Sequence, residues 1–142
     1  MFQDNFFDVV ISLHTLEHLN DPGKAIAEVY RILKNNGLFI FATPNTSCLL
    51  KNLKGNEWHG YRDESHVSLL EPHKWVALVE DKGFKVMKTF SDGFWDAPYI
   101  PLIPTKIQRP IFGFMTAIQF ILCLPFIPVI FGENLIVVAQ KH

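Results

Sequence analysis

One stretch, FDVVISLHTLEHLNDPGKAIAEVYRILKNNGLFIFATPN (residues 7–45), decides the fold of this chain. It opens with a nearly continuous apolar run from Phe6 to Ile11, interrupted only by Asp8. A run of this kind is typical of a strand in a parallel sheet that is covered on both faces. A second apolar run, residues 38–42 (LFIFA), predicts another buried strand of the same kind.

The segment between the two runs predicts a helix. Asp21 is a capping residue, and Pro22 suits a first turn because the N–H that it lacks would have no partner there. Apolar residues then recur at i, i+3, i+4 and i+7, at Ile26, Val29, Tyr30 and Leu33. Gly37 is expected to end the helix in the left-handed conformation. Strand, helix and strand with short joints form a βαβ unit, so the predicted fold class is α/β.

The rest of the chain continues the alternation of helices and strands. Residues 46–70 are polar and aromatic and predict a long loop with about one helical turn. A second helix is predicted from Pro72 to Gly83, with one apolar face made by Trp75, Leu78 and Val79. Residues 84–90 and 135–140 predict two further strands.

Composition narrows the class of protein. A chain of 142 residues fits one domain, and a formal net charge of −1 gives no basic field for nucleic acid, so no nucleic-acid partner is expected. Cys48 and Cys123 lie in neither a CxxC nor a metal-binding spacing, which favours ordinary thiols in a reducing compartment. Residues 1–5 lack a basic n-region, so we expect no signal peptide and a cytoplasmic location.

Three titratable residues, His14, Glu17 and His18, follow the first predicted strand. Ligands of open α/β sheets bind outside the carboxyl ends of the strands, and a helical i, i+3, i+4 spacing would place the three side chains on one face. That face could hold a substrate hydroxyl, with a histidine as general base, or a divalent metal. The structural alternative is that Glu17 and His18 only bond to nearby backbone.

Residues 7–45 resemble the centre of a class I S-adenosylmethionine-dependent methyltransferase, of the type 11/23 kind and the branch with the ubiquinone and menaquinone methyltransferases. In that pattern FDVV is the fourth strand and LEHL–DP is the turn into the next helix. RILKNNGLFIFATPN stands where the family has R-x-L-K-P-G-G and the fifth strand. HVSLLEPHKWVALVEDKGF, residues 66–84, is similar to the segment that follows.

The resemblance implies that residues 1–142 are the C-terminal part of such a domain. The family's sheet order is 3-2-1-4-5-7-6 with the seventh strand antiparallel, so this part would be a Rossmann-like half-sheet, 4-5-7-6. The first predicted strand would then be an edge, which is an aggregation hazard. The family's glycine-rich cofactor loop has no counterpart here, because no two glycines form a GxG. We therefore expect the chain to be incomplete for cofactor binding and inactive alone.

The resemblance also implies roles for individual residues. The cofactor would be S-adenosylmethionine, with Ser12 and Leu13 beside its methionine portion. His14, Glu17 and His18 would face the acceptor as catalytic residues. In the quinone O-methyltransferases a carboxylate–x–x–Glu–His set at this place binds a metal. Here His14 replaces the first carboxylate, so no metal is expected.

A second cluster lies in residues 46–70, which we interpret as a lid on the carboxyl side of the sheet. Its members would bind the substrate: Trp58, His59, Arg62, Asp63 and His66. Arg62 could pair with an anionic group of the acceptor in bidentate fashion. Alternatively, Arg62 and Asp63 form a surface ion pair and Trp58 anchors the loop.

Residues 98–132 predict an apolar insertion before the last strand. Residues 110–131 carry no charge and are long enough to span a bilayer, although two late prolines argue against one clean span. Three interpretations are open. The segment is a buried or dimer-forming helical insertion, or an interfacial helix on a membrane with Lys106 and Arg109 toward the headgroups, or a transmembrane helix.

Two hypotheses about function follow. The leading one is S-adenosylmethionine-dependent methyl transfer to a small-molecule, lipid-linked or glycan acceptor. The other is a non-catalytic accessory or membrane-associated binding module derived from a methyltransferase.

Overall fold

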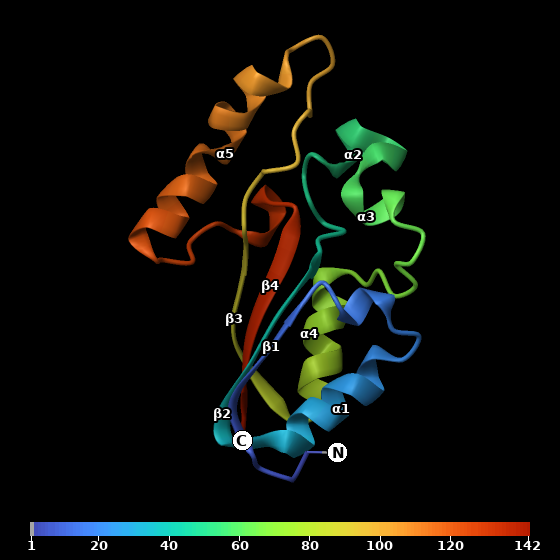
Figure 1. Cartoon of the computed structure of the whole chain (residues 1–142), viewed down its shortest axis with the longest axis vertical. Coiled ribbons are helices and arrows are strands. Elements are labelled where there is room, and N and C mark those ends of the chain that lie inside the picture. Colours follow the sequence, from blue (N-terminus) through green and yellow to red (C-terminus); the bar gives the residue numbers. More distant parts are fainter. Residues whose placement is uncertain (1) are drawn as a thin grey trace.

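A computed structural model describes residues 2–142 of the chain as a four-stranded sheet with helices packed mainly on one face (Figure 1). The strands are β1 (Phe7–Leu13), β2 (Leu33–Pro44), β3 (Phe84–Ser91) and β4 (Asn134–Lys141). Their order is β1-β2-β4-β3, with β1 and β2 parallel and β4 antiparallel to both neighbours. The predicted α/β class and the predicted half-sheet order are confirmed, and β1 is an edge strand.

Two amphipathic helices, α1 (Pro22–Ile32) and α4 (Pro72–Asp81), lie side by side against one face of the sheet (Figure 1). Asp21 caps α1 by accepting a hydrogen bond from the Lys24 N–H at 3.0 Å, as the sequence predicts. The helices bury their apolar sides against alternate residues of the strands, and the main members of this core are Ile26, Trp75, Val79, Phe39, Phe41, Leu135, Val137 and Ala139.

The turn from α1 into β2 differs from the prediction. The helix ends at Ile32, well before Gly37, and β2 begins at once at Leu33. Asn36, and not Gly37, takes the left-handed conformation, with φ of 64°. Gly37 is required for a different reason, because a Cβ at this position would lie 2.8 Å from the carbonyl oxygen of Lys34. Close backbone approach therefore explains this glycine.

The expectation that the first strand is covered on both faces is wrong. Val10 packs against the core, whereas Val9, Ile11 and Leu13 are exposed, and Ile11 keeps 62% of its surface open to solvent. Successive side chains of a strand point to opposite faces, and α1 and α4 both lie on the same face. Among the described residues nothing covers the other side of this edge strand.

The segment between β2 and α4 contains more helix than expected. It forms α2 (Lys51–Lys54), a 3₁₀ turn η2 (Gly55–Glu57) and α3 (His59–Arg62). These short elements lie near the carboxyl end of β2, above the core (Figure 1). They place the predicted lid residues on the side of the sheet where β1 also ends.

The apolar insertion forms one long helix, α5 (Thr105–Leu122), which stands apart from the core beside β3 (Figure 1). Cys123 ends it in the left-handed conformation, with φ of 51°. A 3₁₀ turn, η3 (Val129–Phe131), then leads into β4. The interpretation of the insertion as a buried helix is wrong, because most large apolar side chains of α5 are exposed. Within residues 2–142 no helix combines the length and the apolar character needed to cross a bilayer.

Candidate active site

The chain changes direction directly after β1. His14 takes a left-handed conformation, with φ of 49°, and the next turn is the 3₁₀ helix η1 (Leu16–His18). The predicted trio is therefore not one face of an α-helix. Glu17 is fully buried, whereas His14 and His18 line a cavity at the carboxyl end of the sheet.

His14 and Glu17 form a coupled pair. His14 Nδ1 lies 3.1 Å from Glu17 Oε1, and this hydrogen bond raises the pKa of His14 above its ordinary 6.5 although partial burial opposes the shift. Glu17 Oε2 is buried and has no hydrogen-bond partner. A buried carboxylate that holds one ring nitrogen of a histidine fixes the orientation of the ring. The pair can thus present a basic imidazole to the cavity.

His18 and His66 lie together beside this pair, with ring centroids 4.7 Å apart. His18 Nδ1 is 2.8 Å from Ser65 Oγ, and His66 Nδ1 is 2.8 Å from the carbonyl oxygen of Gly60. Glu17, His18 and His66 each offer one ligand atom, and these three atoms lie within 4.8 Å of one another. Two imidazoles and a carboxylate could hold a divalent cation. The expectation of a metal-free site stays a prediction.

Six of the predicted acceptor-facing residues line a single cavity of about 550 Å³, a volume typical of small-molecule sites. They are His14, His18, His59, Arg62, Asp63 and His66, and Glu64 and Trp95 complete the lining. The lid segment and the end of β1 therefore meet, although they are far apart in sequence. This was the central geometric expectation from the sequence.

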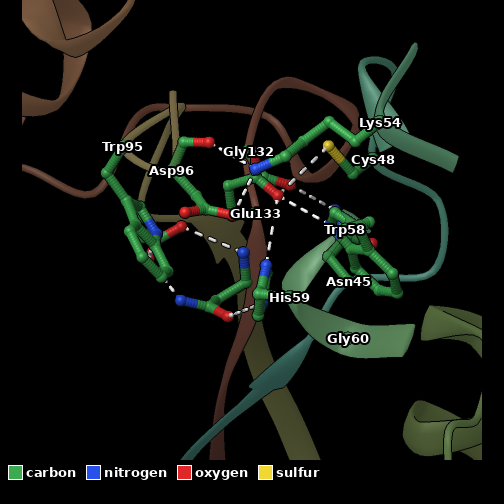
Figure 2. Close-up of polar contacts among 12 residues, drawn as sticks. Asn45, Cys48, Lys54, Trp58, His59, Gly60, Trp95, Asp96, Gly132 and Glu133 are labelled. Atoms are coloured by element: carbon green, nitrogen blue, oxygen red, sulfur yellow. Dashed lines mark hydrogen bonds and ion pairs between the residues drawn. The ribbon is translucent and has the colours of Figure 1, made fainter. Parts of the chain in front are cut away.

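The lid is anchored on Glu133, a fully buried carboxylate (Figure 2). The Trp58 indole N–H donates to Glu133 Oε2 at 2.7 Å, and the Tyr99 hydroxyl donates to Oε1. His59 Nδ1 lies 3.4 Å from Oε2. Burial raises the pKa of Glu133, but the contacts with His59, Tyr99 and Trp58 more than offset this and hold it below its ordinary value. Trp58 is itself fully buried, which agrees with the alternative in which it anchors the loop.

Arg62 and Asp63 do not pair with each other. Asp63 accepts hydrogen bonds from the Ser65 hydroxyl at 2.6 Å and the Ser65 N–H at 2.9 Å, which lower its pKa. Among residues 2–142 no carboxylate lies within ion-pair distance of Arg62. Its guanidinium is therefore available to an anionic group in the cavity.

Sequence reasoning missed Asp92, directly after β3, and the polar pair Glu133-Asn134 at the start of β4. Asp92 accepts hydrogen bonds from the Asn134 N–H at 3.0 Å, the Asn134 amide at 2.6 Å and the Trp95 indole at 2.7 Å. These contacts hold Trp95 at the wall of the cavity. The available signal was the Glu133-Asn134 pair, two polar residues placed directly before a run of buried strand residues.

Ser12 and Leu13, the predicted cofactor residues, lie at the end of β1. Ser12 is half-buried and Leu13 is exposed, and the Leu13 carbonyl accepts a hydrogen bond from the Thr15 hydroxyl at 3.1 Å. An open strand end of this kind can form one wall of a site for a nucleoside-sized cofactor, and it cannot enclose one. The described residues therefore fit S-adenosylmethionine only in part.

Comparisons with known proteins agree with this architecture. The model of a methyltransferase-domain family matches residues 2–89. The uncharacterized protein YafE of Escherichia coli is 32% identical over 92 residues, which cover 64% of this chain and 44% of YafE. An uncharacterized protein of Methanocaldococcus jannaschii is 33% identical over 113 residues, 75% of this chain and 44% of that protein. The chain thus spans less than half the length of these curated relatives.

Solved structures share the fold. A SAM-dependent methyltransferase from Archaeoglobus fulgidus superposes with a TM-score of 0.63 at 19% identity, over 99% of this chain and 62% of that one. A chain from the complex of a methyltransferase with the Haloferax volcanii Trm112 activator gives 0.61 at 20% identity, over 99% and 57%. A probable S-adenosylmethionine-dependent methyltransferase of Mycolicibacterium smegmatis is 32% identical over 88 residues, 61% of this chain and 32% of that protein. The chain belongs to the S-adenosylmethionine-dependent methyltransferase family.

Proposed function

We propose that the domain transfers a methyl group from S-adenosylmethionine to a small-molecule, lipid-linked or glycan acceptor, and that this chain supplies the acceptor-facing wall of the site. One observation carries the proposal. His14, held by the buried carboxylate of Glu17, lines the same 550 Å³ cavity as the lid residues. Its position directly after β1 is where ligands bind in open α/β sheets.

The residues of this chain would align the acceptor and move its proton. The cofactor, when bound, supplies an electrophilic methyl group, so the protein has mainly to position the accepting atom. His14 would take the proton of an acceptor hydroxyl, because its free ring nitrogen is the basic end of the pair with Glu17. The raised pKa of His14 makes the ring a stronger base.

Arg62 would bind an anionic part of the acceptor. It lines the cavity without an ion-pair partner among the described residues, and a guanidinium recognises carboxylate or phosphate with two parallel hydrogen bonds. His18 and His66 would add their rings to the wall of the same cavity. The acceptor class favoured by this lining is therefore a polar molecule that carries both a hydroxyl and an acidic group.

A methyl-transfer assay on the complete gene product, with the cofactor labelled in its methyl group, tests the proposal. His14→Ala should lower kcat by a factor of about 10² to 10⁴, the usual range for loss of a general base. The matched control is His73→Ala, which removes an exposed histidine of α4 outside the cavity and should leave the rate unchanged. Wild-type rates for His14→Ala at every pH would exclude the base.

Calorimetry separates methyl transfer from the accessory-module hypothesis. The complete gene product should bind the cofactor and its demethylated product, whereas residues 1–142 alone should bind both weakly, because they form only one wall. Failure of the complete product to bind either molecule would favour a binding module without catalysis.

A further inference from the structure

Helix α5 is amphipathic in the reverse sense from the other long helices. Its inward side carries the polar residues Gln108, Thr116 and Gln119, which hydrogen-bond to the backbone of loops and of the end of β3. Gln108 is almost completely buried and makes four such bonds, two as acceptor and two as donor, at 2.7–3.0 Å. Gln119 accepts from the N–H groups of residues 126 and 127 at 2.8 and 2.9 Å. These bonds fix the rotation of the helix.

The outward side of α5 is apolar. Ile107, Ile111, Phe114 and Ile121 follow the i, i+4, i+7, i+14 spacing of one helical face, and all four are exposed. Ile111 and Phe114 keep 65% and 62% of their surface open. The helix cannot rotate to bury this stripe without breaking the inward hydrogen bonds. The apolar face is therefore held toward solvent.

The apolar surface extends past both ends of the helix. Leu102 and Ile103 are exposed in the loop before α5, and Phe120 and Leu124 are exposed near its end, Phe120 at 83%. Figure 1 shows α5 projecting away from the sheet, so its outer side is unobstructed by other elements. Contiguous exposed apolar surface of this extent marks an interaction site.

The charged side chains that α5 itself carries are both cations. Residues 97–132 contain Lys106 and Arg109 and no acidic residue, although the whole chain has a net charge of −1. Both cations are exposed and lie near the start of α5. Lys106 and Arg109 lie one helical turn apart, so both can approach the same layer of anionic groups. Anionic headgroups would complement the surface.

We propose that α5 and the loops next to it form a docking surface for an anionic lipid bilayer. The stripe of α5 enters the boundary between headgroups and acyl chains, and Lys106 and Arg109 contact the phosphates. An apolar groove of about 270 Å³ beneath the helix, lined by Phe94, Phe112, Met115, Ile127, Pro128 and Phe131, adds room for part of an acyl chain. Docking requires neither cofactor nor methyl transfer.

Co-sedimentation of the full chain with lipid vesicles tests the proposal. Binding should be strong to vesicles that contain phosphatidylglycerol and much weaker to phosphatidylcholine alone. Each basic residue at a membrane surface contributes about fivefold in affinity, so Lys106→Ala with Arg109→Ala should lower binding by about 25-fold. Ile111→Glu should lower it by about tenfold or more, because a charge cannot enter the apolar boundary.

The matched control is Ile11→Glu, which places the same charge at a site of nearly equal exposure on the open face of β1. It should leave vesicle binding unchanged. Equal loss of binding in Ile11→Glu and Ile111→Glu, or equal binding to both kinds of vesicle, would overturn the proposal. Sedimentation equilibrium gives the remaining outcome, because a wild-type dimer that Ile111→Glu dissociates, without vesicle binding, would assign the surface to a second copy.

Discussion

Figure 1 shows α1 and α4 in the lower half of the molecule, and α2, α3 and α5 in the upper half. The two halves are stabilised by different interactions. In the lower half, α1 and α4 press apolar stripes against the sheet around Trp75. In the upper half, polar side chains bond the lid, the loops and α5 together, with the buried Glu133 and the half-buried Gln119 as the main partners. Both halves use amphipathic helices, but α5 turns most of its large apolar side chains outward and keeps Phe112 against Tyr99. The helical spacing of apolar residues thus predicts a helix and an apolar stripe along it, but it does not predict whether that stripe is buried.

The largest effect should come from the lower half. Trp75→Ala removes a fully buried side chain from the centre of the core and should lower the free energy of unfolding by about 3–5 kcal/mol. Trp75→Phe is the control, because it keeps most of the volume and removes an indole N–H that is buried without a partner. It should cost less than about 1.5 kcal/mol in urea unfolding. Equal costs for the two variants would show that packing does not hold this half.

The next effect should come from the buried carboxylate of the upper half. Glu133→Gln keeps the shape but turns one acceptor oxygen into a donor, which faces either the Trp58 indole N–H or the Tyr99 hydroxyl. We expect a loss of about 1–3 kcal/mol in the free energy of unfolding. Tryptophan fluorescence should report a change around Trp58. An unchanged free energy of unfolding would show that the upper half does not depend on the charge of this carboxylate.

The two halves also differ in how far the sequence predicts them. Asp21-Pro22, the apolar period of α1 and the two apolar runs predict the βαβ unit, because each signal is local and its partners are apolar. The end of α1 could not be predicted from Gly37, since the close contact with the Lys34 carbonyl exists only in the folded turn. The exposed face of β1 could not be predicted either, because an apolar run in the sequence does not indicate which faces of the strand are covered.

A smaller effect should test the reversed orientation of α5. Gln119→Ala leaves two loop N–H groups and one carbonyl without their partner and should cost about 1 kcal/mol or more. Phe114→Ala removes a much larger but exposed side chain and should change the free energy of unfolding by less than about 0.5 kcal/mol. Urea titration of both variants gives the comparison. A larger loss for Phe114→Ala would contradict an outward apolar stripe.

Six residues that line the cavity were among those selected from the sequence, but their arrangement could not be predicted. Six residues from two distant segments reach one cavity, because both segments follow strands whose carboxyl ends lie at the same edge. The burial of Glu17 and the left-handed turn at His14 could not be read from spacing, which suggested a helical face. Glu133 was missed because its partners come from residues 58, 59 and 99, and such separations leave no local pattern.

The smallest expected effect concerns the protonation of His14. Glu17→Gln removes the carboxylate that raises the pKa of His14, so this pKa should fall toward its ordinary 6.5, as measured by NMR titration of the imidazole. A raised folded pKa contributes stability that is present below 6.5 and is lost as pH rises through the folded pKa. Glu17→Gln should therefore be slightly less stable than wild type at low pH, and the difference should vanish above the folded pKa of His14.

The pH dependence of catalysis should follow the same fall in the pKa of His14. A base acts only when it is unprotonated, so the lower pKa in Glu17→Gln should shift the acidic limb of the kcat/KM profile of the complete gene product to lower pH. An unshifted limb together with a shifted NMR titration would show that His14 titrates beside the acceptor without taking its proton. A shift of both would tie the buried carboxylate of Glu17 to the chemistry through the imidazole of His14.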